Sequence, residues 1–133
     1  MELKDKNMCF ACGENNPIGL HLDFAIDTKK QESSATFVPK AEHQGYSDII
    51  HGGILALVMD EAMVKLAFQL GFNAVSVNFN VNLRKPAKVG DKLKVQGKIL
   101  SQEGRKIKAE SKLTDARGEI VADATALLIK LEK

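Results

Sequence analysis

The sequence lacks a marked excess of charge of either sign and is poor in aromatic residues. Its 19 basic and 17 acidic residues give a net charge of +2, and it has no tryptophan and one tyrosine. This balance argues neither for nor against nucleic acid, but no cluster of aromatic and basic side chains of the RNA-binding kind is present. We therefore expect no nucleic-acid partner.

Long apolar runs and a secretion signal are also missing. No uncharged apolar run reaches ~18 residues, so no membrane-spanning segment is predicted. The opening MELKDKNM does not have the pattern of a signal peptide. We expect a cytoplasmic protein without a membrane partner. The 133 residues suffice for one domain, and no repeat, linker or low-complexity stretch divides them.

Cysteine is scarce: Cys9 and Cys12 form a single CxxC pair in the stretch MCFACGENNPIGL. A structural zinc site usually needs a second pair of ligands, and neither His21 nor His43 stands at a supporting spacing. A thioredoxin-type redox pair would open a helix, whereas Gly13 and the residues after it turn the chain. We predict two reduced thiols in a turn, with no metal and no cofactor; a zinc site or a redox pair is the alternative.

Residues 54–70 have the pattern of one helix that is apolar around most of its circumference. Glu61, Lys65 and Gln69 stand four residues apart and form one polar stripe, which we expect to face water, with the first two spaced for an ion pair. Asp60 falls outside this stripe, among apolar neighbours. A carboxylate there loses solvation, so it either bonds a buried polar group or has a chemical task.

His51-Gly52-Gly53 begins this helix, and Gly71 ends it where a left-handed cap is expected. Two glycines at a helix start leave backbone amides that no side chain obstructs. Those amides and the positive end of the helix dipole suit a developing oxyanion. The alternative is a tight junction that needs glycine for its backbone angles.

Alternation of apolar and polar residues predicts two strands before the helix and four after it, with glycine-containing hairpin turns at SQEGR and DARGE. After the helix, Val75, Val77 and Phe79 should share one face of a strand, and Ser76 and Asn78 the other. The predicted strands are residues 18–28, 33–38, 75–84, 91–100, 105–114 and 118–130.

Hairpins favour antiparallel pairing, and an apolar helix must be covered. The sequence thus predicts an α+β fold in one domain, residues 1–133, with one long central helix wrapped by a curved antiparallel sheet. Small side chains at Ala122, Ala124 and Ala126 would let the helix lie close to the sheet.

Two segments carry a resemblance to a known family. His51-Gly52-Gly53 with Asp60 nine residues after the histidine, and VSVNFNVNLRKPAKVGD after the helix, resemble the hotdog-fold acyl-CoA thioesterases of the phenylacetate-degradation type (PaaI-like). The opening CFACG and NPIGL resemble one subgroup of that family. The resemblance covers nearly the whole chain and implies the hotdog fold and hydrolysis of an acyl-CoA.

The resemblance also implies roles for single residues. Several members place a catalytic-site hydroxyl at the position of Ser76, where it would hold the water or the carboxylate. Many members have Asn six residues before the histidine of the glycine motif. This chain has Gly45 there, so His43 or Gln44 would take over the orienting role. His51 would bond the thioester carbonyl, hold the loop or merely cap the helix.

In the implied mechanism, the Gly53 amide, helped by Gly52, binds the oxyanion, and Asp60 acts as general base or nucleophile. Gly53 and Asp60 stand seven residues apart, roughly 10 Å along a helix axis. One helix cannot bring both groups to one carbonyl, whereas two antiparallel helices of a two-fold dimer can. We expect a homodimer with shared sites, and a homotetramer formed from two dimers.

The CoA phosphates would be received by basic side chains, although each of these charges can equally be solvated surface. The predicted substrate-binding residues are Gly52, His43, Asn78, Arg84, Lys85 and Arg105, with Lys88 and Lys106 as further cations. Two other functions stay open: a non-catalytic acyl-CoA sensor, against which Asp60 argues, and a hotdog hydratase or dehydratase, whose histidine and acid pattern is not found here.

Overall fold

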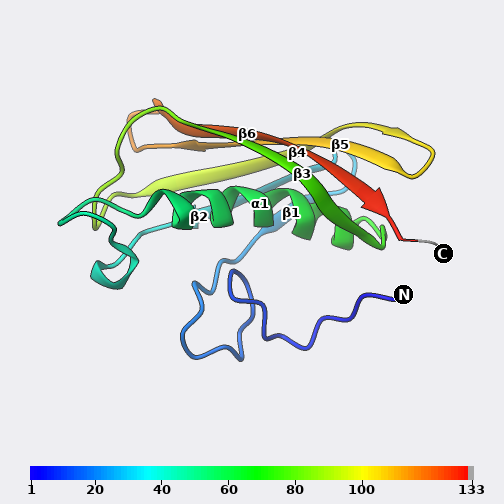
Figure 1. Ribbon diagram of the computed structural model, residues 1–133, viewed down its shortest axis with the longest axis horizontal. Coiled ribbons are helices and arrows are strands. Elements are labelled where there is room, and N and C mark those ends of the chain that lie inside the picture. The colour runs from blue at the N-terminus through cyan, green and yellow to red at the C-terminus, as the bar shows by residue number, and fades with distance from the viewer. Residues whose placement is uncertain (132–133) are drawn as a thin grey trace.

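The computed structural model describes residues 1–131 and shows one long helix packed against a curved sheet (Figure 1). The predicted domain, residues 1–133, extends two residues beyond this range. Among the described residues, no helix is both long and apolar enough to cross a membrane. The elements are β1 (Ala25–Asp27), β2 (Glu32–Phe37), the 3-10 helix η1 (Ala41–His43), α1 (Gly52–Gln69), β3 (Ala74–Leu83), β4 (Leu93–Glu103), β5 (Lys106–Thr114) and β6 (Ile120–Lys130).

The strands form one antiparallel sheet in the order β1-β2-β4-β5-β6-β3, which confirms the predicted fold class. Tight turns join β4 to β5 and β5 to β6, and they hold Gly104 and Gly118 at φ of 61° and 83°. Both turns were predicted from their glycines. The long connection from β3 to β4 places β3 at the edge of the sheet, where, within residues 1–131, it pairs with β6 alone.

The predicted strand 18–28 is wrong over most of its length, because only Ala25–Asp27 joins the sheet. Leu20 and Leu22 instead donate their backbone N–H groups to the carbonyl oxygens of Phe10 and Ala11, at 2.8 and 2.9 Å. His21, between the two leucines, has a φ of 53°, which a regular strand does not accommodate. The alternation of Leu20 and Leu22 therefore reflects their contact with Phe10 and Ala11 and not a place in the sheet.

The N-terminal segment, residues 1–22, lies on the side of α1 that faces away from the sheet (Figure 1). It covers part of the polar stripe predicted to face water. Glu61 and Lys65 are half-buried, so that prediction is wrong at these two residues, whereas Gln69 is exposed as expected. Lys65 forms its ion pair with Asp5, with 3.5 Å between Nζ and Oδ2.

Helix α1 approaches β4 closely at Gly97. A Cβ at this position would lie 2.4 Å from the carbonyl oxygen of Ala62 and 2.6 Å from Ser33 Oγ. The Ser33 hydroxyl donates to the same carbonyl at 2.6 Å, so β2, α1 and β4 meet at one point. The alanine row of β6 is buried as predicted, and it adds to the space for the helix.

We expect Gly97→Ala to lower the free energy of unfolding by about 1–3 kcal/mol, the usual cost of overpacking a core, because the new methyl group meets backbone atoms that cannot turn aside. Urea unfolding measures this loss. The matched control is Lys98→Ala on the neighbouring exposed position, which should change stability by less than ~0.5 kcal/mol. Equal losses in both variants would contradict the close-packed contact.

Candidate active site

Asp60 is half-buried near the middle of α1. Its Oδ1 atom is buried and has no hydrogen-bond partner among residues 1–131. Burial raises the pKa of this carboxyl group, and the neighbouring Ser76 side chain partly opposes the rise. An unpartnered buried carboxylate oxygen is costly unless a ligand, a water molecule or a second subunit supplies a donor. The second carboxylate oxygen of Asp60 therefore lacks the partner that a purely structural carboxylate would have.

A β-bulge in β3 sets the orientation of Ser76. Ser76 pairs with Leu128, and the next paired residue, Asn78, is opposite Leu127, so Val77 has no partner in the ladder. Its side chain is 57% exposed. An extra residue of this kind changes which face of the strand the flanking side chains occupy, and bulges of this type are common beside active sites.

Ser76 and Phe79 therefore share the face of the sheet that is turned toward α1, because their partners on β6 are both buried. The predicted alternation, which placed Ser76 and Asn78 together, is wrong for this reason. Asn78 lies on the opposite face, where it accepts a hydrogen bond from Asn80 at 2.8 Å. The bulge brings Ser76 to Asp60 and takes Asn78 away from it.

The start of α1 is capped by His51. The Nδ1 atom of His51 accepts a hydrogen bond from the Gly53 N–H group at 2.9 Å, which is the capping role that the sequence left open. The Gly53 amide can therefore bind another acceptor only after the imidazole ring turns away. Among the described residues, the Gly52 N–H group has no acceptor. The helix start thus presents one free amide and one amide that His51 holds.

A groove of about 670 Å³ opens beside this helix start. Its walls come from the loop 45–50, the first turn of α1 and the segment 83–87 that follows β3. Apolar side chains, including Ile49, Leu55 and Leu83, make up much of the lining. Gly52 also lies on the wall, where an added Cβ would be only 2.8 Å from Leu83 Cδ1. The groove can therefore hold an apolar chain with its polar end near the helix amides.

The loop before the helix is held by its own polar side chains. Nδ1 of His43 accepts from the Lys40 N–H group at 2.9 Å, and burial lowers the pKa of this histidine. Gln44 donates through Nε2 to the carbonyl oxygen of Ala41 at 2.8 Å and accepts from the Asp48 N–H group. The backbone carbonyl oxygen of His43 also accepts a hydrogen bond from the His51 N–H group, at 2.9 Å. Both predicted orienting residues thus support the loop that carries His51.

Two predicted phosphate-binding cations, Arg84 and Lys85, lie at the groove, and both have carboxylate partners. The Arg84 guanidinium pairs with Asp123. The Lys85 ammonium contacts Asp115 and Glu119, each at 2.5 Å. These ion pairs raise the pKa of Arg84 and of Lys85, so both side chains are cationic at neutral pH.

Arg105 lies elsewhere. It stands in the turn between β4 and β5, where its Nε atom donates to the carbonyl oxygen of Lys130 at 3.0 Å. This turn is at the end of the molecule opposite the start of α1 (Figure 1). Arg105 and its neighbour Lys106 line a separate hollow there. The structure therefore brings Arg84 and Lys85 to the groove and leaves Arg105 outside it.

Glu61, next to Asp60, has a role that the sequence did not reveal. Its Oε2 atom accepts hydrogen bonds from Cys12 Sγ at 2.7 Å and from Cys9 Sγ at 3.5 Å. Burial raises the pKa of Glu61, and burial, together with this carboxylate, raises the pKa of the Cys12 thiol. No sequence spacing connects residue 61 with residues 9 and 12, so the contact is visible only in the fold.

The comparison with known families identifies the chain. Residues 48–122 match the family model of the thioesterase superfamily, a stretch that includes the helix, most of the groove lining and most of the sheet. Comparison with curated proteins finds no match.

Solved structures share the fold over most of the chain. One of them, a thioesterase superfamily protein, aligns with 93% of this chain, with a TM-score of 0.87 and 19% identity. This chain spans only 61% of the length of that protein. The PaaI protein from the phenylacetic acid degradation operon of E. coli covers 85% of this chain and is itself covered over 81%, with a TM-score of 0.79 and 18% identity.

A Streptococcus mutans protein bound to acetyl CoA covers 84% of this chain and is covered over 90%, with a TM-score of 0.76 and 22% identity. These likenesses establish the fold. Because the family model matches more than half of its residues, the chain belongs to the thioesterase superfamily, and its long helix α1 on a six-stranded sheet is the hotdog fold of that superfamily.

Proposed function

We propose that this chain hydrolyses the thioester of an acyl-CoA to a free acid and CoA, with Asp60 as its essential carboxylate. The observation that carries this proposal is the buried Oδ1 atom of Asp60, which has no partner within residues 1–131 and lies beside a serine that a bulge has turned toward it. The S. mutans protein bound to acetyl CoA and a hypothetical thioesterase protein of Streptococcus pneumoniae with coenzyme A support the substrate class.

The roles follow from the chemistry of the groups. Asp60 either takes a proton from the attacking water or attacks the thioester carbon itself. Ser76 is a positioning residue that holds the carboxylate. The Gly52 amide is the more accessible oxyanion donor, and the Gly53 amide joins it when the His51 ring turns to the substrate carbonyl. Breakdown of the tetrahedral intermediate expels the CoA thiolate, and on the nucleophilic route water then hydrolyses the mixed anhydride, which releases the acid and restores Asp60.

The groove at the helix start suits the rest of the substrate. Its apolar walls from Ile49, Leu55 and Leu83 would contact uncharged parts of the substrate. Arg84 and Lys85 at its rim would meet the CoA phosphates, in competition with their present carboxylate partners. The Oδ1 atom of Asp60, without a partner within residues 1–131, favours a hydrolase over a sensor, because a sensor needs no desolvated carboxylate at the thioester.

A complete site in this proposal needs two chains. The Gly53 amide and the Asp60 carboxylate stand roughly 10 Å apart along α1, too far to meet one carbonyl. Strand β3 is ten residues long, has one edge that no other described strand pairs with, and exposes Val77 and Leu83, each by more than half. A long edge strand of this kind is a template for pairing with another chain. Pairing along β3 would set two α1 helices side by side and antiparallel.

The first test of the function is Asp60→Asn. We expect it to lower kcat/KM for the best acyl-CoA by about 10²–10⁴-fold, which is the usual contribution of a general base. Thiol release from aryl, short-chain and long-chain acyl-CoAs measures turnover and finds that best substrate. Glu110→Gln, which makes the same chemical change on an exposed position of β5, should have no effect.

Asp60→Asn should not destabilise the fold. Because burial raises the pKa of Asp60 in the folded state, its stabilising contribution is present below its unfolded pKa and is lost as pH rises through the folded pKa. At pH 7 the charged form therefore opposes folding, and a neutral amide relieves that cost. An inactive but unfolded variant, or equal losses of kcat/KM in both variants, would contradict the assignment.

The second test concerns pH. The wild-type kcat/KM should rise with pH around a midpoint above ~4, the ordinary range of aspartate, because Asp60 must lose its proton to react. Ser76→Ala removes the hydroxyl group that lowers this pKa, so the midpoint should move to higher pH. A merely structural serine would change the plateau and leave the midpoint in place, and that result would remove Ser76 from the site.

The third test asks whether two chains share each site. Asp60→Asn and Gly53→Pro should each be nearly inactive alone, and proline is tolerated in the first turn of a helix. In a mixed dimer with shared sites, one site carries both changes and the other carries neither. Refolding the two variants together should then restore about a quarter of wild-type activity, because half of randomly formed dimers are mixed. No recovery, with mixed dimers confirmed by mass spectrometry and both variants folded, would place the site within one chain.

A further inference from the structure

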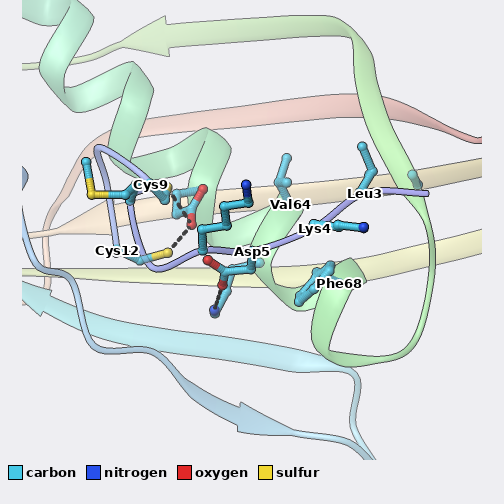
Figure 2. Close-up of a pocket in the computed structure, with 12 residues that line it drawn as sticks. Leu3, Lys4, Asp5, Cys9, Cys12, Val64 and Phe68 are labelled. Atoms are coloured by element: carbon cyan, nitrogen blue, oxygen red, sulfur yellow. Dashed lines mark hydrogen bonds and ion pairs between the residues drawn. The ribbon is translucent and has the colours of Figure 1, made fainter. Parts of the chain in front are cut away.

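Three side chains of types that can bind metal ions converge at a place outside the groove. Cys9 and Cys12 come from the N-terminal loop and Glu61 comes from α1, and one potential ligand atom from each lies within 4.8 Å of the other two. Figure 2 shows both cysteines directed from their loop toward the helix. The three residues are half-buried, so none is a solvated surface group.

The cysteine loop is held in shape by its own backbone. The Gly13 N–H group donates to the Cys9 carbonyl oxygen at 2.8 Å, and a Cβ on Gly13 would lie 2.4 Å from the Cys9 nitrogen. Ala11, between the cysteines, is 1% exposed and anchors the loop in the core. The CxxC pair is therefore presented to α1 by a turn that only glycine permits.

Hydrogen bonding alone satisfies this cluster poorly. Both thiols direct their weak donors at a single oxygen of Glu61, Oε2. The nearest candidate for a cationic partner on the helix, Lys65, forms its ion pair with Asp5. A half-buried carboxylate bonded to thiols alone lacks the strong donor or cation that usually offsets its desolvation.

The spacing suits a tetrahedral metal centre. Metal–sulfur and metal–oxygen distances of about 2.3 and 2.0 Å place tetrahedral ligand atoms roughly 3.5 Å apart. The Cys9 Sγ–Glu61 Oε2 distance of 3.5 Å already has this value, and the Cys12 Sγ–Oε2 distance of 2.7 Å would open by a fraction of an ångström.

We propose that Cys9, Cys12 and Glu61 form a binding site for a divalent transition-metal ion, best matched by Zn²⁺. Two thiolates and one carboxylate favour zinc over the hard cations Mg²⁺ and Ca²⁺, which take oxygen ligands. Metal binding replaces two thiol protons, which leave to solvent. The cluster then carries one negative charge, and Lys65 and Lys4 on the same cavity wall can offset it.

Beside the cluster lies a cavity of about 390 Å³ lined by residues of the N-terminal segment and by Val64 and Phe68 of α1 (Figure 2). A water molecule from this side would complete the tetrahedral set as the fourth ligand. A metal ion here would fasten the N-terminal segment to the helix at the residue next to Asp60. This inference does not depend on the proposed hydrolysis, because it concerns metal content and not turnover.

Cobalt binding to the tag-free, reduced, full-length protein tests the site. Titration with Co²⁺ in the absence of oxygen should give a saturable thiolate-to-cobalt charge-transfer band and the visible bands of tetrahedral cobalt, at one ion per chain. Zn²⁺ should displace Co²⁺ and abolish these bands. The absence of a saturable thiolate band in the folded wild-type protein would overturn the proposal whatever the variants do.

Variants assign the ligands. Cys9→Ser combined with Cys12→Ser should lose the charge-transfer band. Glu61→Gln should keep the band with a cobalt Kd raised at least ~tenfold, because it loses an anionic ligand. Glu14→Gln removes an exposed carboxylate two residues after Cys12 and should bind as the wild type does. Equal cobalt affinity in Glu61→Gln and the wild type, with both folded by circular dichroism, would overturn the three-ligand site.

Discussion

Helix α1 is covered on two sides, by the sheet and by the N-terminal segment, and the rest of the structure depends on this enclosure. Gly97 brings the backbone of β4 to the carbonyl oxygen of Ala62, and Cys12 meets the opposite side of the helix one residue earlier, at Glu61. Two successive carboxylates, Asp60 and Glu61, are consequently both desolvated. Ordinary cores avoid such groups, because each needs a compensating partner.

The two carboxylates meet this need differently, and the difference separates their roles. Glu61 is met by two thiols that arrive from a distant part of the chain. Asp60 has the Ser76 hydroxyl beside it and keeps Oδ1 without a partner in the described chain. The first arrangement resembles a binding site that a metal ion would complete. The second leaves one carboxylate oxygen without a partner among the described residues, as the proposed hydrolysis requires.

The sequence predicted those features of the structure that depend on residues close to one another along the chain. The apolar periodicity of 54–70, the glycines of the hairpins and the isolation of Asp60 all follow from residues close in sequence, and all three are found. The orientation of Ser76 could not be predicted, because the bulge at Val77 is set by the register between β3 and β6. The sequence also did not predict the burial of Glu61, and its prediction of a strand over 18–28 was wrong. Both have one cause, because both depend on where the N-terminal segment packs.

Strand β3 connects the two halves of the proposed mechanism. Its inner face carries Ser76 to Asp60, while its free edge is the surface along which a second chain would pair. The bulge serves both, because it turns the serine inward and leaves Val77 exposed beside the edge. In the proposed dimer, closing this edge would also bring the amides of one helix start to the carboxylate of the other. The hydrogen bond from Gly53 to His51 then acts as a cap that holds the helix start together until a substrate carbonyl replaces it.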